Sequence, residues 1–312
     1  MAMDRKQTVA AAAVILACVP LSGCDTTEVV PAIMGATAAP AATSTVETTT
    51  ESGVADATTA LDEFCAQQPG KFSVYLQDLS TGESYTYGAE AFYYGASTIK
   101  VPFALWLCEQ ADAGTINLDD TISNIFYGQT DLYADTTLEA YADSAAVPAR
   151  TAMRAMLGDS DNNATMLLAA AWPATAESGF VDFVEKLGFS AADTCSVIEE
   201  DGVSGTITVT DLAAAMQALY SYMESDAPHA EFLSTCFEQA EYEALYLPTG
   251  YQAVHKYGSW DAAFHDAAIV YAPHPYLLCC MTDQGDREID FPAAPVAAMQ
   301  TLGKLVWSYL DR

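Results

Sequence analysis

Three short segments carry the residues best suited to chemistry. Ser97 and Lys100 stand three apart at the start of an apolar stretch. Ser160-Asp161-Asn162 follows in a polar turn, and Lys256-Tyr257-Gly258-Ser259 lies in a later stretch of alternating polarity. A serine hydroxyl is a weak nucleophile until a base removes its proton. On a helix that begins at Ser97, Lys100 would lie one turn later on the same face, so the spacing favours a Ser97 nucleophile with Lys100 as its base.

An ammonium group cannot accept a proton, so Lys100 must be neutral for part of the cycle. Burial and a second nearby cation, Lys256, would both lower its pKa. The chain has a net charge of −31 and only 11 lysines and arginines, and two of these fall in the three segments. Each segment alone has a simpler interpretation: a serine helix cap, a polar turn and a solvated lysine. The occurrence of all three segments in one chain favours a catalytic role over these simpler interpretations.

Other catalytic chemistries find less support in the residue pattern. No Gly-x-Ser-x-Gly elbow surrounds Ser97. No His-Glu-x-x-His sequence and no clustered thiolates are present, so we expect no metal and no other cofactor. The histidines lie in no motif with an acidic partner, and His265-Asp266 is interpreted as a structural pair at the start of a strand. The four histidines are His229, His255, His265 and His274.

The periodicity of the chain predicts where these segments lie. A helix is expected over 56–67, a β-hairpin over 72–76 and 84–87, and helices over 97–113, 148–157, 164–172, 180–187 and 211–223. Three strands at 254–260, 267–271 and 276–281 and a helix at 292–310 complete the pattern. The predicted fold class is α/β, an α+β sandwich. It has an antiparallel five-stranded sheet built from both chain ends and covered by helices, beside an all-helical lobe. The cleft between them is the expected site.

In this order and on these elements, the three segments resemble the active site of the class A β-lactamase and penicillin-binding serine hydrolase superfamily. The resemblance covers nearly all of 56–312. It implies an acyl-enzyme formed on Ser97 with a β-lactam or an acyl-D-Ala-like substrate. It also implies that the backbone N–H groups of Ser97 and Ser259 form the oxyanion hole.

The resemblance assigns roles to further residues. Ser160 would relay a proton to the leaving nitrogen while Lys256 polarises it. Asn162 would bind the side-chain amide of the substrate and also contact Lys100. Gly258 would let the substrate backbone lie against the strand, and Ser259 would bind a substrate carboxylate.

Two departures from the superfamily pattern bear on function. Tyr257 stands where the superfamily usually carries Thr or Ser, which places affinity for ordinary penicillins in question. The Glu-x-x-Leu-Asn loop that positions the deacylating water in class A β-lactamases is absent from 187–208. An acid in this region could substitute, although a solvated acidic loop is the simpler interpretation. The acids are Asp193, Glu199, Glu200 and Asp201.

Three functions therefore stay open. The first is a serine hydrolase of the β-lactamase type with an unusual deacylation route. The second is a penicillin-binding DD-peptidase that acts on peptidoglycan peptides. The third is a tethered binding or sensor domain without catalysis. The expected partner is a small β-lactam or a peptidoglycan peptide bound by a monomer. The acidic surface makes nucleic acid a poor partner.

The first residues have the character of a lipoprotein signal. A basic start and a brief apolar run precede Leu21-Ser22-Gly23-Cys24, which predicts a signal peptide over 1–23 and lipid attachment at Cys24. An ordinary signal peptide is the alternative. Residues 24–55 are rich in Thr and Ala, contain no aromatic residue and predict a disordered tether. The domain at 56–312 would then be exported and lipid-anchored at the outer face of the bacterial cell membrane.

Six cysteines follow this tether. Export would permit disulfides, but the sequence does not choose among the pairings, and buried free thiols are the alternative. Cys279 and Cys280 would point to opposite faces of one strand and are not expected to pair with each other. The six are Cys65, Cys108, Cys195, Cys236, Cys279 and Cys280.

Overall fold

The structure, a computed structural model, describes residues 53–129, 137–198, 202–238, 240 and 243–310. All of them fall within the unit Thr49–Arg312. The predicted signal peptide, Cys24 and nearly all of the predicted tether lie outside the described residues. Glu199, Glu200 and Asp201 lie outside them too.

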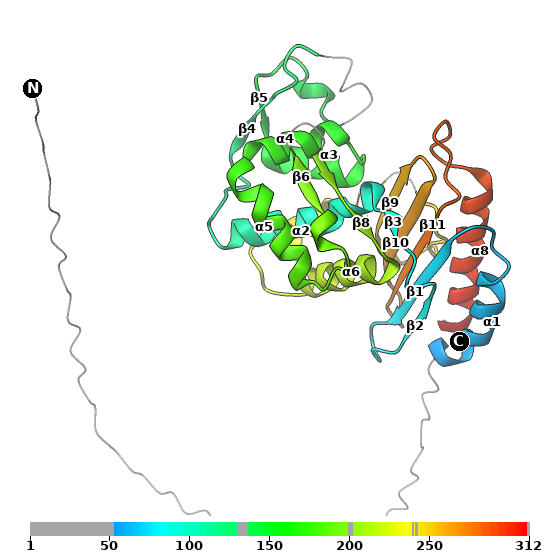
Figure 1. Cartoon of the computed structure of the whole chain (residues 1–312). Coiled ribbons are helices and arrows are strands. Elements are labelled where there is room, and N and C mark those ends of the chain that lie inside the picture. Colours follow the sequence, from blue (N-terminus) through cyan, green and yellow to red (C-terminus); the bar gives the residue numbers. More distant parts are fainter. Residues whose placement is uncertain (1–52, 130–136, 199–201, 239, 241–242, 311–312) are drawn as a thin grey trace, which may run out of the picture. The chain divides into compact units, whose positions relative to one another are not determined.

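A five-stranded sheet forms the centre of the fold (Figure 1). Its order is β2-β1-β11-β10-β9, and every neighbouring pair is antiparallel. The strands are β1 (Phe72–Asp78), β2 (Ser84–Tyr87), β9 (Gln252–Trp260), β10 (Ala263–Tyr271) and β11 (Tyr276–Thr282). The predicted antiparallel sheet from both chain ends is confirmed, with β9 at its edge.

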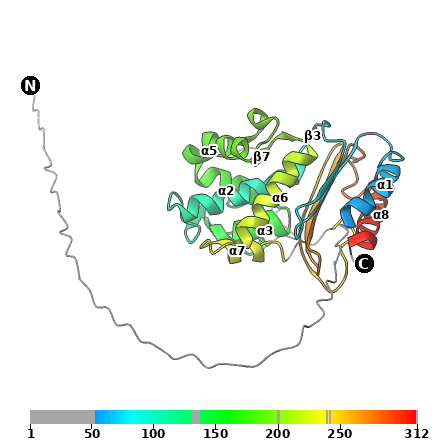
Figure 2. The same cartoon turned by 90° about the horizontal axis from the view of Figure 1, so that it is seen from below.

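The two faces of the sheet contribute to different cores. On one face, Leu278 and Cys280 pack against α1 (Gly53–Cys65) and α8 (Ala293–Leu310). On the other face, Leu277 and Cys279 contribute to the core of the helical lobe. Figure 2 shows the sheet nearly edge-on between these two layers. Alternate residues of a strand point to opposite faces, which explains how one strand serves both cores.

The helical lobe is built around α2 (Lys100–Asp112), whose residues from Lys100 to Cys108 are all buried. A helix that is apolar all round belongs in a core, and α2 places Phe103 and Trp106 against Phe180. The other helices of the lobe are α3 (Ala149–Gly158), α4 (Asn162–Ala171), α5 (Pro173–Lys186), α6 (Val209–Met223) and α7 (Ala230–Thr235), with the 3₁₀ turns η3 (Glu139–Tyr141) and η4 (Ala192–Thr194).

Short two-stranded ladders, which the periodicity did not predict, brace the lobe. Two- and three-residue strands are too short to show an alternating pattern. The pairs are β3 (Tyr93–Tyr94) with β8 (Thr206–Ile207), β4 (Thr121–Ser123) with β5 (Ala146–Pro148), and β6 (Ser196–Ile198) with β7 (Gly202–Ser204). The last pair lies within 187–208, the region that lacks the Glu-x-x-Leu-Asn loop.

The start of the helix at Ser97 differs from the sequence prediction. Ala96–Ile99 forms a 3₁₀ turn, η1, and α2 begins at Lys100. Ala96 has a φ of +44°, an uncommon conformation for a residue with a side chain. Side chains three apart eclipse one another in a 3₁₀ turn, so Ser97 and Lys100 still share a face.

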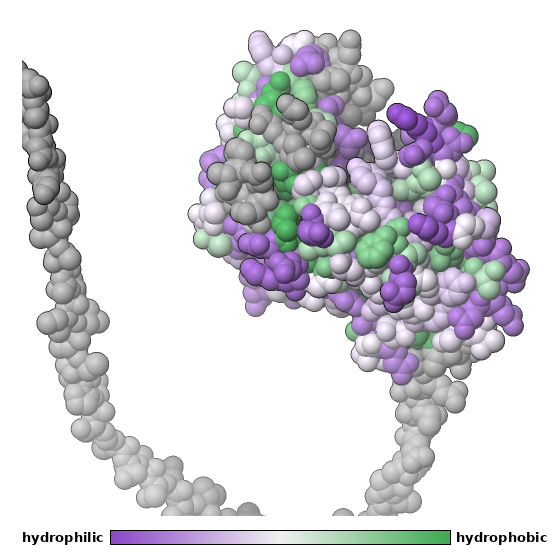
Figure 3. All heavy atoms as spheres, in the orientation of Figure 1, coloured by the Kyte–Doolittle hydropathy of each residue, from purple (hydrophilic) through white to green (hydrophobic). Residues whose placement is uncertain are grey.

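The six described cysteines are free and buried. Burial raises the pKa of the Cys65 thiol to about 12 and that of Cys195 to about 11, so both act as small hydrophobic residues. No helix among the described residues has the length and apolar character needed to cross a membrane. In Figure 3, hydrophilic residues lie over the sheet side and over the lower part of the helical lobe, and hydrophobic ones form small separate patches.

His265 fastens the segment before Ser97 to the sheet. Its Nε2 lies 2.9 Å from the Tyr94 carbonyl oxygen, and its Nδ1 lies 3.3 Å from the Thr282 backbone nitrogen. Nε2–H therefore donates while Nδ1 accepts, which only the neutral imidazole can do. Burial lowers the pKa of His265 to about 4, against the smaller opposing effect of its backbone bonds.

The sequence pattern suggested that His265 and Asp266 form a structural pair, but in the structure their side chains do not pair with each other. Asp266 faces the opposite side of β10, where it accepts hydrogen bonds from the backbone N–H groups of Ala244 and Leu245 at 2.8 and 2.9 Å. Its other oxygen lies 3.8 Å from His255 Nδ1. Both residues are structural, but they act on different faces of the sheet.

We predict that His265 makes stability depend on pH. In the unfolded chain a histidine titrates near 6.5, whereas folded His265 stays neutral down to about 4. Between these values the unfolded state binds more protons, so stability is present above pH 6.5 and is lost as the pH falls. Between pH 7.5 and 5 the loss is about 2 kcal/mol. Urea unfolding of the wild type and His265→Gln at both values should show a smaller pH effect in the variant. Equal effects would contradict the assignment.

Candidate active site

The three chemical segments converge at a cavity of about 350 Å³ beside the edge strand β9. Ser97 reaches it from η1, Lys100 from the start of α2 and Asn162 from the start of α4. Ser259 closes it from β9. Residues from β3, η1, α4, β7 and β9 complete the lining: Tyr94, Ala96, Met166, Val203, Ser204 and Trp260. The cleft expected between sheet and helical lobe is therefore present.

Lys100 is 3% exposed and points at the turn before α4. Its Nζ lies 2.6 Å from the Ser160 carbonyl oxygen and 2.7 Å from Asn162 Oδ1. Burial lowers the pKa of Lys100 to about 7, although the nearby Asp161 carboxylate opposes the shift. A neutral amine has two N–H groups, enough to satisfy both acceptors, and it retains a lone pair. In the described part of the chain, Lys100 makes these bonds and none to Ser97 Oγ.

Lys256 is 1% exposed and approaches the same turn from β9. Its Nζ lies 2.9 Å from Ser160 Oγ and 3.0 Å from the Tyr257 carbonyl oxygen. Burial, and then repulsion from Lys100, lowers the pKa of Lys256 well below its ordinary value, while Asp266 opposes the shift. Because the two ammonium groups repel, loss of the first proton is a property of the pair.

Ser160 is held between the two lysines by its backbone. Its φ of +58° is a left-handed conformation that non-glycine residues seldom adopt. This turns its carbonyl oxygen to Lys100 and its hydroxyl to Lys256. The next residue, Asp161, caps α4 by accepting a hydrogen bond from Ala164 N–H at 3.0 Å. The polar turn predicted from the sequence therefore links the two lysines through Ser160.

Gly258 sets the approach of β9 to the nucleophile turn. A Cβ at this position would lie 2.9 Å from the backbone nitrogens of both Ser97 and Thr98. The absent side chain therefore makes room for η1, which adds a structural reason for glycine to the substrate-approach role predicted for it.

The register of β9 with β10 indicates the direction of the neighbouring Ser259 N–H. Trp260 pairs with Ala263 across a two-residue turn, so this closing pair is hydrogen-bonded and the next pair, Ser259 with Phe264, is not. This register leaves the Ser259 N–H group at the free edge of β9.

Tyr257 places an aromatic ring where a short hydroxyl was expected from the resemblance. The ring centroid lies 5.1 Å from that of Phe291 and 4.5 Å from Lys256 Nζ. The Tyr257 hydroxyl therefore stands a ring length away from the position that a Thr or Ser hydroxyl would occupy.

Acidic residues are missing from the described lining of the cavity. Asp193 lies on η4, is exposed and does not line it. Asp161 lies next to the site, but its carboxylate caps α4. Among the described residues, no group of three His, Cys, Asp or Glu side chains is placed to hold a metal ion. Tyr94, Met166 and Trp260 were not predicted as lining residues, because their only signal in the sequence is proximity to the motifs.

Comparison with known proteins agrees with this architecture. A sequence model described as the beta-lactamase enzyme family matches residues 56–310. A beta lactamase from Burkholderia vietnamiensis is similar at 23% identity with a TM-score of 0.66, over 80% of this chain and 95% of that one. A class A beta-lactamase from Mycobacterium abscessus is similar at 18% identity with a TM-score of 0.65, over 82% and 100%.

A third similar structure is a mutant of PBP-A as an acyl-enzyme complex with penicillin-G. It is 19% identical with a TM-score of 0.67, over 83% of this chain and 97% of that one. No curated protein sequence matches the chain. The structural similarities at these identities concern the fold. From the family match, the chain belongs to the beta-lactamase enzyme family, within the β-lactamase-like serine hydrolases.

We predict that Gly258→Ala slows any reaction of Ser97 with a fluorescent penicillin by about 10- to 100-fold, because displaced backbone at Ser97 would disturb the reacting geometry. The added methyl group should cost about 1–3 kcal/mol of stability. Labelling rates and thermal unfolding measured together separate the two effects. A folded variant that is labelled at the wild-type rate would show that η1 and β9 need not be in close contact.

Proposed function

We propose that this protein is a serine hydrolase whose Ser97 is acylated by β-lactams or by acyl-D-Ala-like peptides. One observation carries the proposal: two almost fully buried lysines, Lys100 and Lys256, meet at Ser160 beside the cavity that Ser97 lines. Burying two amines together is costly unless one of them is neutral. A neutral amine beside a serine hydroxyl is what a base-activated nucleophile needs.

In the proposed acylation, Ser97 Oγ attacks the substrate carbonyl carbon and its proton passes to the neutral Lys100 Nζ. The Ser97 and Ser259 N–H groups stabilise the oxyanion. As the C–N bond breaks, the leaving nitrogen takes a proton from Ser160 Oγ. The Lys256 ammonium, which holds the proton of the lysine pair at the start and whose Nζ lies 2.9 Å away, restores the Ser160 proton. Lys256 is then neutral and Lys100 carries the proton taken from Ser97. The products are an ester on Ser97 and a free amine, or the opened ring when the substrate is a β-lactam.

Asn162 and Tyr257 would complete substrate binding. Asn162 is exposed, and its Oδ1 already accepts a hydrogen bond from Lys100, so its amide nitrogen remains to bind a substrate carbonyl. Ser259 and Tyr257 would flank the carboxylate of the substrate. The distant Tyr257 hydroxyl favours substrates unlike ordinary penicillins at this end.

Deacylation needs a water and a base to hydrolyse the ester. The carboxylate-free lining of the described cavity favours slow deacylation, hence a penicillin-binding peptidase as the second candidate function. The similarity to PBP-A, seen as an acyl-enzyme with penicillin-G, supports this second candidate. An acidic residue at 199–201 that activates this water would instead support the first candidate function, a hydrolase of the β-lactamase type.

Export and lipid anchoring at Cys24 are part of the proposal. They are supported by the apolar run ending in Leu21-Ser22-Gly23-Cys24 and by the free approach to polymeric wall peptides that a tether would give. A monomer suffices for the mechanism, since one chain supplies every group it uses.

We expect intact-mass analysis to detect one β-lactam adduct on the wild type and none on Ser97→Ala. A fluorescent penicillin and a cephalosporin are suitable probes, and matching thermal unfolding of both proteins would show that folding is retained. An undiminished adduct on Ser97→Ala would contradict the nucleophile assignment.

The lifetime of the adduct separates the candidate functions. An adduct that forms and disappears supports β-lactamase turnover, and one that persists supports the peptidase. For the peptidase we expect release of terminal D-Ala from a cell-wall peptide. A folded wild type that shows neither reaction would leave the tethered binding domain.

We further predict that acylation accelerates as the pH rises through about 7, where Lys100 becomes neutral. Below that pH the rate should fall about tenfold per pH unit. Asp161 opposes the lowering of the Lys100 pKa, so Asp161→Asn, which keeps an oxygen to cap α4, should move the midpoint to lower pH. An unchanged or higher midpoint in that variant would contradict Lys100 as the base.

A further inference from the structure

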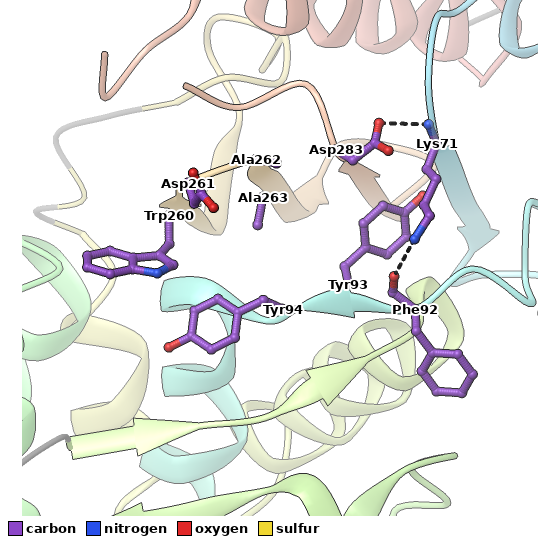
Figure 4. A pocket seen from close by; sticks show the side chains of 9 residues that line it. All are labelled: Lys71, Phe92, Tyr93, Tyr94, Trp260, Asp261, Ala262, Ala263 and Asp283. Carbon is purple, nitrogen blue, oxygen red and sulfur yellow. Dashed lines mark hydrogen bonds between the residues drawn. The ribbon is translucent and has the colours of Figure 1, made fainter. Parts of the chain in front are cut away.

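A second cavity of about 360 Å³ adjoins the catalytic cavity (Figure 4). Tyr94 and Trp260 line both cavities, so their side chains form the wall between them. The remaining lining residues come from the ends of β1, β10 and β11 and from the segment around β3: Lys71, Phe92, Tyr93, Asp261, Ala262, Ala263 and Asp283.

The far end of this second cavity holds two opposite charges. Lys71 and Asp283 stand across from each other beyond β1 and β11, and Asp283 Oδ1 accepts a hydrogen bond from the Lys71 backbone N–H at 2.7 Å. The Lys71 ammonium turns instead toward the Phe92 carbonyl oxygen, 3.4 Å away. It forms no ion pair with any carboxylate of the described residues. The Lys71 Nζ also lies 5.8 Å from the centroid of the Tyr93 ring. The cavity therefore presents a cation and an anion that are not joined in a direct ion pair.

The order of residues along β9 indicates which part of the substrate would face the second cavity in the proposed reaction. Lys256 and Ser160 mark the side on which the leaving nitrogen is protonated. Ser97 and Ser259 mark the position of the carbonyl. The next residue, Trp260, therefore lies on the acyl side of the substrate, and the second cavity lies beyond it.

The wall formed by Tyr94 and Trp260 is exposed to solvent, and the turn that follows Trp260 is held in place by a neighbouring loop. Tyr94 is 44% and Trp260 58% exposed, which is unusual for large aromatic side chains and typical of binding surfaces. Asp261 occupies a tight turn with a φ of +52°, and Ala262 accepts a hydrogen bond from Gly285 N–H at 2.8 Å. A Cβ on Gly285 would lie 2.5 Å from the Asp261 carbonyl oxygen, so this turn packs directly against the neighbouring loop.

We propose that the second cavity is a subsite for the far end of the acyl group, and that this end is a zwitterionic α-amino acid. Its carboxylate binds the Lys71 ammonium, its ammonium binds the Asp283 carboxylate, and the chain before it lies against Tyr94 and Trp260. The subsite rests on the proposed function for its direction along β9, because an acyl group enters only if Ser97 is acylated.

The test compares cephalosporins that share one nucleus and differ only at the side-chain end. Cephalosporin C ends in a zwitterionic amino acid. Its N-acetyl derivative lacks the ammonium, its side-chain carboxamide lacks the carboxylate, and the 7-acetamido analogue lacks the chain. We expect cephalosporin C to acylate the wild type about tenfold faster than each of the others, as loss of a charge-assisted hydrogen bond would imply. Equal rates for all four would overturn the subsite.

Two variants and a matched control locate the effect. Lys71→Met and Asp283→Asn should each remove most of the preference for cephalosporin C and leave the rate with the 7-acetamido analogue within about twofold of the wild type. Lys186→Met removes an exposed lysine from the end of α5, away from both cavities. Its preference should equal that of the wild type. Retained preference in both cavity variants, or equal loss in the control, would overturn the assignment.

A failure of the proposed function gives a different result. If none of the four compounds forms an adduct, calorimetric binding of cephalosporin C to the unreacted protein and to Lys71→Met tests the subsite directly. Binding that weakens in Lys71→Met would support the subsite even without acylation. Absent binding, or equal binding by both proteins, would overturn it.

Discussion

The burial of two lysines around one serine is the constraint on which the candidate site depends. Lys100 and Lys256 bind the carbonyl and the hydroxyl of the same residue, Ser160, from opposite sides. Two ammonium groups so placed repel each other and lack solvation, which favours the loss of one proton. The fold supplies this arrangement with two layers: a buried helix delivers Lys100 and the edge strand of the sheet delivers Lys256. Neither layer alone would exclude water from its lysine.

Backbone conformation does as much as side-chain type at this site. Ala96 and Ser160 both adopt positive φ values, and the lack of a side chain at Gly258 lets β9 approach η1. Strained residues persist only where the surrounding structure over-determines them. Here they are supported by the cap of Asp161 on α4 and by the bond from His265 to Tyr94. The chemistry of the motifs therefore depends on residues that motif matching does not include.

The sequence predicted the sheet, most of the helices and the meeting of the three motifs, because those depend on strong periodicity and on long apolar runs. It did not predict the 3₁₀ turn at Ala96, which lies directly against β9 at Gly258. The small ladders β3–β8 and β6–β7 are too short to leave a pattern. Trp260 and Tyr94 carried no signal as lining residues, since their role follows from the positions of elements far apart in the chain. Lys71 and Asp283 meet only because β1 pairs with β11.

The most direct test of this account is the pKa of the Lys100 side chain itself. NMR titration of protein labelled with ¹⁵N-lysine would report each amine, with Lys100→Arg identifying the signal. We expect Lys100 to titrate at about 7, so that a neutral amine is available to Ser97 at physiological pH. A Lys100 that stays charged up to its ordinary value of 10.5 would contradict it, since no base would then be available to Ser97.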